Sequence, residues 1–335
     1  MDLNITANSR CAVIGYGSWA TAIAKVLSLK EPLFDWYVRN PEVLESLSTE
    51  SHNCRYLADV DFDMSCIHVS DDINEVVANA DIIFLIVPAA YLVSYLDDIK
   101  VPLNDKFIVS AIKGFIPGEN QTVTQYFHKR YHLEDEQLGF ITGPTHAEEV
   151  SHHRITHLTV ACSNLENAML IGKKIQTNFM ILNYSTEVLF LEYNAIMKNI
   201  YSVAIGVAVG LGYGDNFIAV LVANCASEMA AFLKDITDHE FRYIPSSFLG
   251  DLLVSCYSCH SRNRRFGMLI GRGNSVKSSL NEMTMVAEGY YASRFVGFIP
   301  EEKRKIIPIA NMVYCILYEG LTARKAMKRI EPQLA

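Results

Sequence analysis

The chain has 335 residues, half of them apolar and a fifth charged, which is typical of a soluble globular protein with room for two domains. Its net charge of −8 argues against nucleic acid or an anionic membrane as the main partner. The N-terminal segment has no apolar run of signal-peptide length, so we expect a cytoplasmic protein whose eight scattered cysteines stay reduced.

The most informative stretch begins with a short apolar run at residues 11–14, which predicts a buried strand. Gly15 and Gly17 follow as a turn, and Ser18 can cap an amphipathic helix that continues to residue 27. With Ala20 these glycines match the G-x-G-x-x-G/A fingerprint of dinucleotide-binding folds. An ordinary strand–helix turn is the alternative, but the early position of the motif favours a bound pyrophosphate above the helix N-terminus.

Residues 34–38 predict a second strand, which ends at Arg39. A fold specific for NAD usually carries Asp or Glu near this point, whereas this chain has Arg39 and Asn40. A guanidinium there can stack on adenine or pair with a 2′-phosphate, so either NAD or NADP is permitted. A solvated surface arginine is the alternative.

Further apolar runs at residues 81–87, 106–111 and 138–142 predict buried parallel strands, and residues 155–161 and 179–182 predict outer ones. We therefore expect an α/β fold, with a Rossmann-type doubly wound sheet over residues 1–185 and an all-α domain over residues 186–335.

Residues 200–223 are apolar enough to suggest a membrane span, but Asp215 and Asn216 interrupt them. A buried helix in a large domain is the better interpretation, so no membrane insertion is expected. Cys256, Cys259 and His260 match the C-x-x-C-H haem-attachment string, but no export signal and no further ligands at zinc spacing accompany them. We therefore expect no metal.

Polar residues within the apolar helical half are the candidates for chemistry. Lys198 lies in a strongly apolar stretch, with Asn194 one helical turn before it and Asn199 after it. Such a lysine is either a buried acid/base with a lowered pKa or a side chain that reaches out at a helix edge. Asp251 has apolar neighbours too, so it either pairs with Lys198 or lies exposed near a helix start at Ser246 or Ser247.

Ser261, Arg262 and Asn263 offer a hydroxyl, a guanidinium and an amide in succession, which suits a phosphate at a helix start. A polar loop is the alternative. Glu288 precedes a glycine among small and aromatic residues, and its spacing alone indicates no role.

Together these segments resemble the NAD(P)-dependent glycerol-3-phosphate dehydrogenases of the bacterial biosynthetic type. The resemblance runs from about Cys11 to Tyr291 and is carried by IGYGSWATAIA, IKGF, TGPTHAEE, EYNAIMKNIYSVAIGVAVGLGYGDN, GDLLVSCYSCHSRN, RFG and AEG, in that order. It implies reversible reduction of dihydroxyacetone phosphate to sn-glycerol 3-phosphate by NADH or NADPH, for glycerophospholipid synthesis. It also implies a C-terminal domain like that of 6-phosphogluconate dehydrogenase and a homodimer.

The resemblance further implies roles for individual residues. Lys198 would be the general acid, and the base in reverse, with Asp251 tuning it and Lys113 close to substrate and cofactor. Arg262 and Asn263 would take the phosphate beside Ser261, while Gly143 and Thr145 would line the substrate. The positions that match cofactor contacts are Gly15, Gly17, Ser18, Trp19, Arg39, Lys113, Ala147, Arg262, Val286 and Glu288.

The departures from the family pattern are small. Ala20 replaces a glycine, Thr145 replaces a serine and Ser255 replaces a threonine, and each keeps the size or hydroxyl that the position needs. Two other functions fit the sequence less well. A related β-hydroxyacid or ketopantoate-type reductase is disfavoured because residues 261–263 suit a phosphate. A non-catalytic nucleotide sensor or binding protein is disfavoured because the polar residues for chemistry are all present.

Overall fold

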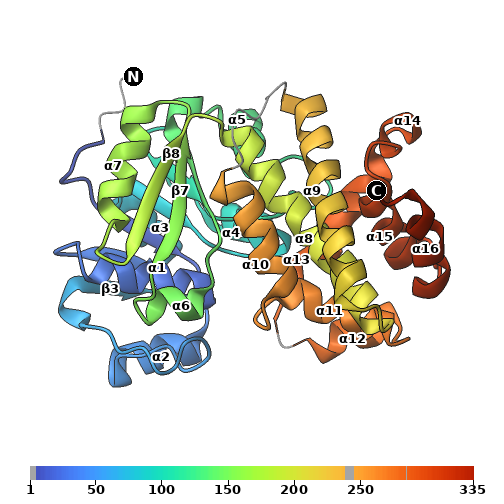
Figure 1. The fold of residues 1–335 in the computed structure, drawn as a ribbon. Coiled ribbons are helices and arrows are strands. Elements are labelled where there is room, and N and C mark those ends of the chain that lie inside the picture. The colour runs from blue at the N-terminus through green and yellow to red at the C-terminus, as the bar shows by residue number, and fades with distance from the viewer. Residues whose placement is uncertain (1–4, 238–244, 284) are drawn as a thin grey trace. The chain divides into compact units, whose positions relative to one another are not determined.

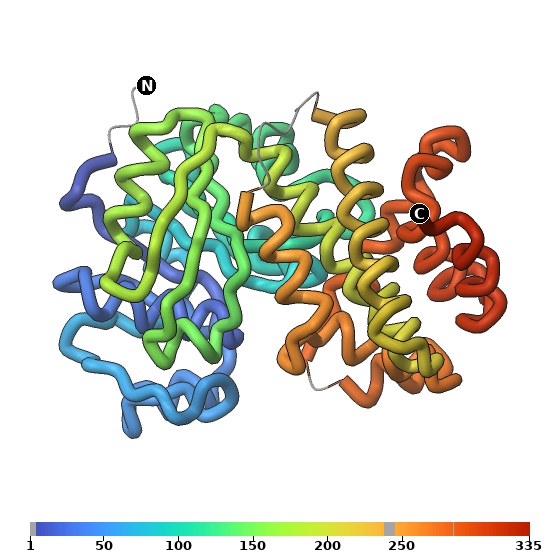
Figure 2. The backbone as a smooth tube through the Cα atoms, viewed as in Figure 1, coloured from blue at the N-terminus to red at the C-terminus, as the bar shows by residue number. Residues whose placement is uncertain are grey.

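The computed structural model describes residues 5–237, 245–283 and 285–335 (Figure 1). The chain forms two compact units. The first comprises residues up to Ile112 together with Val123–Val188, and the second comprises Lys113–Thr122 together with Leu189–Ala335. The course of the backbone through each unit can be followed by colour in Figure 2.

The first unit is built on an eight-stranded sheet of order β3-β2-β1-β4-β5-β6-β7-β8. All neighbouring strands are parallel except β6 and β7. The order of β1 to β6 is that of a Rossmann fold, which confirms the predicted class. The strands are β1 (Cys11–Ile14), β2 (Phe34–Tyr37), β3 (Ile67–Ser70), β4 (Ile82–Leu85), β5 (Phe107–Ser110), β6 (Leu138–Thr142), β7 (Thr156–Cys162) and β8 (Met180–Ser185).

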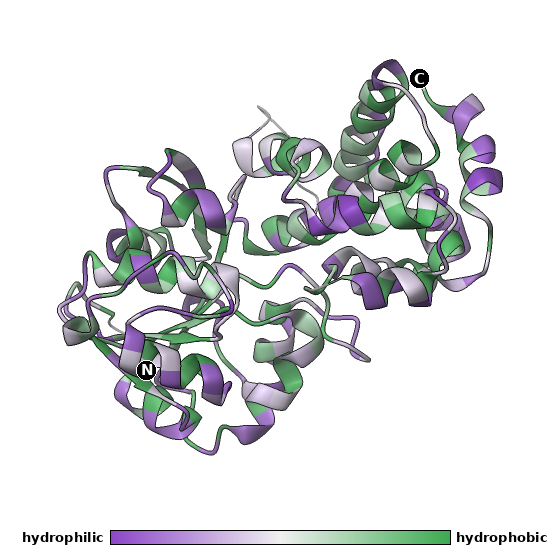
Figure 3. Cartoon of the chain, turned by 90° about the horizontal axis from the view of Figure 1, so that it is seen from below, coloured by the Kyte–Doolittle hydropathy of each residue, from purple (hydrophilic) through white to green (hydrophobic). Residues whose placement is uncertain are grey.

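Amphipathic helices join and cover these strands. Figure 3 shows such helices with hydrophobic residues on one side and hydrophilic residues on the other, and Figure 1 shows α7 alongside β7 and β8. The helices of this unit are α1 (Ser18–Ser28), α2 (Pro41–Glu50), α3 (Ile73–Asn79), α4 (Leu92–Asp98), α5 (Val123–Tyr131), α6 (Ala147–Ser151) and α7 (Leu165–Ile175).

Two local expectations for this unit need correction. The edge strand β3 went unpredicted, because its sequence IHVS is short and only its first residue is buried, which leaves no apolar run to detect. Ser18 does not cap α1. It is the first helical residue, and Gly17 holds the N-cap position with extended backbone.

All regular structure in the described part of the second unit is helical. A π-helical turn at Ser246–Gly250 leads directly into α10. The helices are α8 (Val188–Gly210), α9 (Asp215–Thr237), α10 (Asp251–Tyr257), α11 (Arg262–Gly271), α12 (Val276–Glu282), α13 (Glu288–Ser293), α14 (Glu301–Arg304), α15 (Pro308–Tyr318) and α16 (Ala323–Ile330).

The single buried helix predicted over residues 200–223 is wrong in its continuity. Gly212, with a φ of +89°, turns the chain, so α8 ends at Gly210 and α9 starts at Asp215. The described part of α8 up to Ala208 is almost entirely buried. By length and composition α9 could cross a membrane, but it is also a helix of the kind found in protein cores, and 44% of its most apolar window is buried.

The helices α8 and α11 touch backbone to backbone through glycines spaced four residues apart. A Cβ atom on Gly206 would lie 2.1 Å from the carbonyl oxygen of Arg264, and one on Gly267 would lie 2.2 Å from that of Val203. Gly210 and Gly271 repeat the contact one turn further on. This close approach packs α11 against the C-terminal end of α8.

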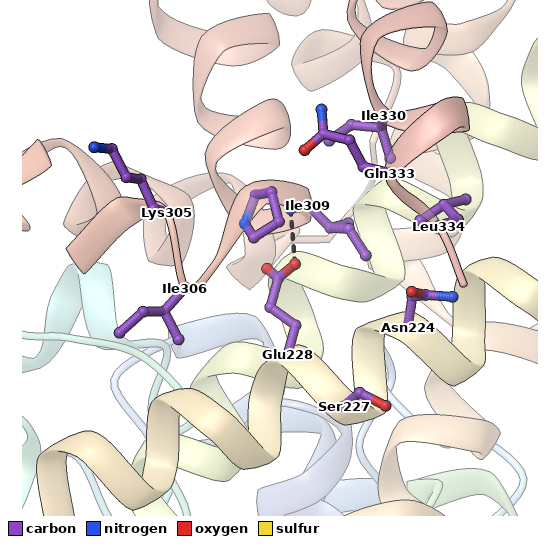
Figure 4. Close-up of a pocket in the computed structure, with 10 residues that line it drawn as sticks. Asn224, Ser227, Glu228, Lys305, Ile306, Ile309, Ile330, Gln333 and Leu334 are labelled. Atoms are coloured by element: carbon purple, nitrogen blue, oxygen red, sulfur yellow. Dashed lines mark hydrogen bonds between the residues drawn. The ribbon is translucent and has the colours of Figure 1, made fainter. Parts of the chain in front are cut away.

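A buried carboxylate fixes α15 in the same unit. Glu228 of α9 accepts hydrogen bonds from the backbone N–H groups of Ile309 (2.8 Å) and Ala310 (2.9 Å) and from the hydroxyl of Tyr201 (3.1 Å), as Figure 4 shows in part. Burial nevertheless raises the pKa of Glu228 to about 7. Its two backbone hydrogen bonds satisfy N–H groups in the first turn of α15, which have no acceptor within the helix itself.

Because α8 and α11 leave no space for a methyl group, Gly267→Ala should lower the free energy of unfolding by about 2–4 kcal/mol. Gly214→Ala is the matched control, since nothing lies within 4 Å of its added Cβ atom, and it should change stability by less than about 1 kcal/mol. Urea unfolding followed by circular dichroism measures both. Equal stability of the two variants would contradict the backbone contact.

Candidate active site

The glycine turn after β1 is shaped by two different demands. Gly15 has a φ of +122°, and a Cβ atom there would lie 2.1 Å from the carbonyl oxygen of Ile86, so only glycine fits. Gly17 has no heavy atom within 4 Å of an added Cβ atom, so open space lies above it. The turn is therefore packed tightly against the protein at Gly15 and open at Gly17, which allows a ligand to approach the backbone there.

The three carbonyl oxygens of this turn are all bound by protein donors. The indole of Trp36 donates to Gly15 at 2.7 Å, the amide of Asn53 donates to Tyr16 at 2.9 Å, and the hydroxyl of Thr21 donates to Gly17 at 3.0 Å. Holding the carbonyls this way orients the turn next to the N-terminus of α1, where the backbone favours an anion. The pyrophosphate of a dinucleotide fits this cradle.

Trp36 and Asn53 were not recognised as site residues from the sequence. Trp36 lies within a strand and reads as core, and Asn53 follows α2 in a loop without a motif. Both are fully buried. Their contribution appears only when the fold brings them under the turn.

The end of β2 offers an arginine and no free acid. Arg39 is half exposed and lies 5.4 Å from the ring of Tyr95 and 3.9 Å from the carboxylate of Asp98. The acid within β2, Asp35, is fully buried and paired with Arg10 and with His68 at 2.8 Å. It is therefore not available to a ribose, and the arginine at this position is compatible with both NAD and NADP.

Gly143, Thr145 and Ala147 follow β6, at the same carboxyl edge of the sheet as the glycine turn. Gly143 has a φ of +152°, and a Cβ atom there would meet the carbonyl oxygen of His157 at 2.7 Å. The hydroxyl of Thr145 donates to Gly143 at 3.2 Å. Ala147 begins α6, which packs against α1. Trp19 of α1 packs partly against the core, and Ser18 precedes it.

The second unit contains a buried cluster of two lysines around one carboxylate. Lys198 is 5% exposed and donates to one oxygen of Asp251 and, at 3.1 Å, to the hydroxyl of Ser255. The other oxygen of Asp251 lies 3.5 Å from the ammonium of Lys113. Asp251 is 1% exposed. Lys198 is therefore not a surface lysine, and Asp251 is not an exposed residue near a helix start.

Burial lowers the pKa of Lys198 to about 8. Asp251 opposes this shift by stabilising the ammonium, and Lys113 adds to it by repulsion. Asp251 and Ser255 accept two of the three N–H bonds of the ammonium, and no acceptor for the third is found among the described residues. An amine with this pKa can give up and take back a proton near neutral pH.

An amide network connects this cluster to α11 and α13. The side chain of Asn199 donates to the carbonyl of Lys113 at 3.1 Å and accepts from Asn263 at 2.9 Å. Asn263 in turn accepts from the backbone N–H of Gly289 at 2.9 Å, next to Glu288 at the start of α13. Asn199 was noted in the sequence without a role, because its partners are distant along the chain.

The remaining predicted residues of this unit lie at or near the starts of α11 and α13. Ser261 is buried and caps α11 by accepting from the N–H of Arg264 at 3.3 Å. Arg262 is exposed at the first position of α11, where Asn263 follows it. Val286 is half buried two residues before α13. The structure thus joins Lys113, Lys198 and Asp251 by direct contacts. It connects Asn263 to them through Asn199, and Ser261 and Arg262 lie beside Asn263 at the start of α11.

Among the described residues, no three His, Cys, Asp or Glu side chains gather as a metal site would require. Within the C-x-x-C-H string, Cys256 is buried and Cys259 is exposed. A pocket of about 210 Å³ between α9 and the start of α15 is lined by none of the predicted site residues.

Comparison with known proteins places both units. Residues 10–168 match the family model described as the N-terminus of NAD-dependent glycerol-3-phosphate dehydrogenase, and residues 187–328 match that of its C-terminus. A glycerol-3-phosphate dehydrogenase [NAD(P)+] of Chlorobium phaeobacteroides is 32% identical over 95% of this chain and 96% of its own length. That of Enterococcus faecalis is 29% identical over 96% and 95%.

Among solved structures, the glycerol-3-phosphate dehydrogenase of Coxiella burnetii superposes with a TM-score of 0.87 at 24% identity, over 97% of this chain and 99% of its own. At that identity the superposition shows the shared fold. The family models, which together extend over most of the sequence, carry the assignment further. This chain belongs to the family of NAD-dependent glycerol-3-phosphate dehydrogenases.

Proposed function

We propose that the chain catalyses the reversible reduction of dihydroxyacetone phosphate to sn-glycerol 3-phosphate with NADH or NADPH. The observation that carries this proposal is the buried cluster of Lys198, Asp251 and Lys113. It holds two ammonium groups against one carboxylate, so it is net positive and suits a phosphorylated, anionic ketone. Membership of the family supports the same reaction.

Lys198 acts as the general acid in this proposal. The bound dinucleotide supplies the hydride, and negative charge then develops on the carbonyl oxygen of the substrate. The free N–H of the Lys198 ammonium stabilises that charge and delivers the proton, which is worth roughly 10²–10⁴-fold in rate. In the reverse direction the neutral amine takes the hydroxyl proton. Asp251 orients the amine, and Lys113 adds a second positive charge for substrate and cofactor.

The phosphate is bound in this proposal by Arg262 and Asn263, with Ser261 beside them. The exposed guanidinium of Arg262 stands at the N-terminus of a ten-residue helix, and both charge and backbone there favour an anion. One N–H of the Asn263 amide remains for the phosphate after its bond to Asn199. Gly143 and Thr145 line the substrate. Binding the unreactive phosphate helps to fix the reacting carbonyl.

The glycine turn carries the cofactor pyrophosphate in this proposal, and Arg39 contacts the adenosine end. The full set of cofactor contacts is proposed to be Gly15, Gly17, Ser18, Trp19, Arg39, Lys113, Ala147, Arg262, Val286 and Glu288. We further propose a dinucleotide-binding domain over residues 1–185 and a substrate-binding domain over residues 186–335. A cytoplasmic homodimer that supplies glycerophospholipid synthesis, without membrane insertion or nucleic acid, completes the proposal.

Lys198→Met removes the ammonium and keeps the length of the side chain. We expect kcat for dihydroxyacetone phosphate to fall by about 10²–10⁴-fold while NADH binding is retained. A spectrophotometric assay of NADH and NADPH consumption measures the loss. Lys305→Met is the control, because Lys305 is exposed and lines the separate pocket. Turnover by Lys198→Met close to that of the unaltered protein would exclude Lys198 as the acid.

The lowered pKa of Lys198, about 8, gives the two reaction directions opposite pH profiles. Reduction needs the ammonium, so kcat/KM should be level below that pH and fall above it. Oxidation needs the neutral amine, so its kcat/KM should rise through the same range. Profiles recorded above pH ~7, where the substrate phosphate is already a dianion, test this. Profiles that run in parallel for both directions would contradict the assignment.

Gly17→Ala tests the glycine turn without straining it. No heavy atom lies within 4 Å of the added methyl group, so stability should hardly change. The methyl group does occupy the position that the pyrophosphate needs. We expect the Kd for NADH, measured by fluorescence titration, to rise at least about tenfold. Gly15→Ala is the contrasting variant, because its methyl group meets the carbonyl oxygen of Ile86 and should lower stability instead. An unchanged Kd in Gly17→Ala would refute the pyrophosphate site.

A further inference from the structure

A ladder of polar contacts joins α8 to the segment that carries Asp251. Asn194 and Lys198 are four residues apart on α8 and lie on the same face of that helix. Their partners Ser247 and Asp251 are also four residues apart on the segment opposite. The first contact is the ion pair of Lys198 with Asp251. The second joins the amide nitrogen of Asn194 to the carbonyl oxygen of Ser247 at 2.7 Å. Both contacts are buried.

The backbone around Ser247 is irregular. Ser246–Gly250 forms a π-helical turn, and the N–H of Asp251 bonds to the carbonyls of Ser246 and Phe248. It passes over the carbonyl of Ser247, which an α-helix would have used. The Asn194 amide bonds to that carbonyl instead. π-helical turns of this kind occur often at functional sites, because they displace the residues that follow.

The other half of the Asn194 amide serves no structural bond. Asn194 is fully buried, and its side-chain oxygen has no hydrogen-bond partner among the described residues. A buried acceptor without a partner costs about 1–3 kcal/mol, which an apolar residue of the same volume would avoid. Stability alone therefore does not explain an asparagine here.

We propose that Asn194 is a positioning residue, which locks the π-helical turn and thereby holds the carboxylate of Asp251 against Lys198. This inference rests on the proposed role of Lys198. The hydrogen bond of Asn194 goes to the carbonyl of Ser247, four residues before Asp251, so Asn194 acts on Asp251 through the turn.

Loosening of the turn would shift the pKa of Lys198 downward. The charged and titratable groups that face Lys198 are Asp251 from α10, Lys113 from the segment before Thr122, and the thiol of Cys256. Asp251 alone among them stabilises the ammonium. If the turn loosens and Asp251 moves away, burial and Lys113 act unopposed, and the pKa of Lys198 falls further.

Asn194→Leu keeps the number and branching of the side-chain heavy atoms and removes the amide, at the expense of a somewhat larger side chain. We expect the descending limb of kcat/KM for reduction to move down by at least ~0.5 pH unit. We also expect kcat to fall by about tenfold through misplacement of the amine, with the Kd for NADH unchanged. Asn194→Ala, which leaves only a small cavity, is measured alongside and takes its place if the leucine prevents folding.

Tyr201→Phe is the matched control. It also removes one buried hydrogen bond from α8, to Glu228 at 3.1 Å, but not one to the turn. It should lower stability to a similar degree and leave the pH limb in place. Asn194 variants that lose stability while keeping the limb and kcat of the unaltered protein would overturn the inference. Failure of the underlying role of Lys198 is seen separately, as turnover by Lys198→Met.

Discussion

The ion pair between Lys198 and Asp251 is the interaction on which the rest of the second unit depends. Both groups are almost completely buried, and removing Asp251 would leave the ammonium groups of Lys198 and Lys113 without their shared counter-charge. A hydrophobic pair of similar size would stabilise such a core at least as well. The pair is therefore better explained by chemistry than by stability, since burial brings the pKa of the lysine to a range where a proton can move.

The surrounding helices hold this pair by contacts that tolerate little change. Glycines bring α11 against α8 without intervening side chains, which places Asn263 within reach of Asn199, the neighbour of Lys198. The Asn199 amide also holds the carbonyl of Lys113. Phe115 stacks on Phe295 at 4.1 Å between ring centroids, and so packs the segment after Lys113 into the same unit. Backbone and amide contacts thus fix the two lysines more firmly than their flexible side chains could.

The features that followed from sequence are those written locally. The Gly15 turn and the apolar strands each depend on a few neighbouring residues, whereas spacing alone left Lys198 open between a buried and an exposed position. The short strand β3 escaped detection because it is half exposed, and the break at Gly212 was hidden inside an apolar run. Asn53, Asn199 and Asn194 bind residues 37, 86 and 53 positions away, respectively, so no local pattern shows their partners.

The two units contribute to recognition in different ways. The glycine turn presents backbone, and its shape is fixed by Trp36, Asn53 and Thr21 binding carbonyl oxygens, so it can serve any dinucleotide whatever the second substrate is. The lysine–aspartate cluster presents side chains whose net positive charge and spare N–H suit one kind of partner, a small anionic carbonyl compound. In the proposed mechanism the choice of reaction therefore lies with the helical unit, where the proposed role of Asn194 acts on the chemistry through the π-helical turn.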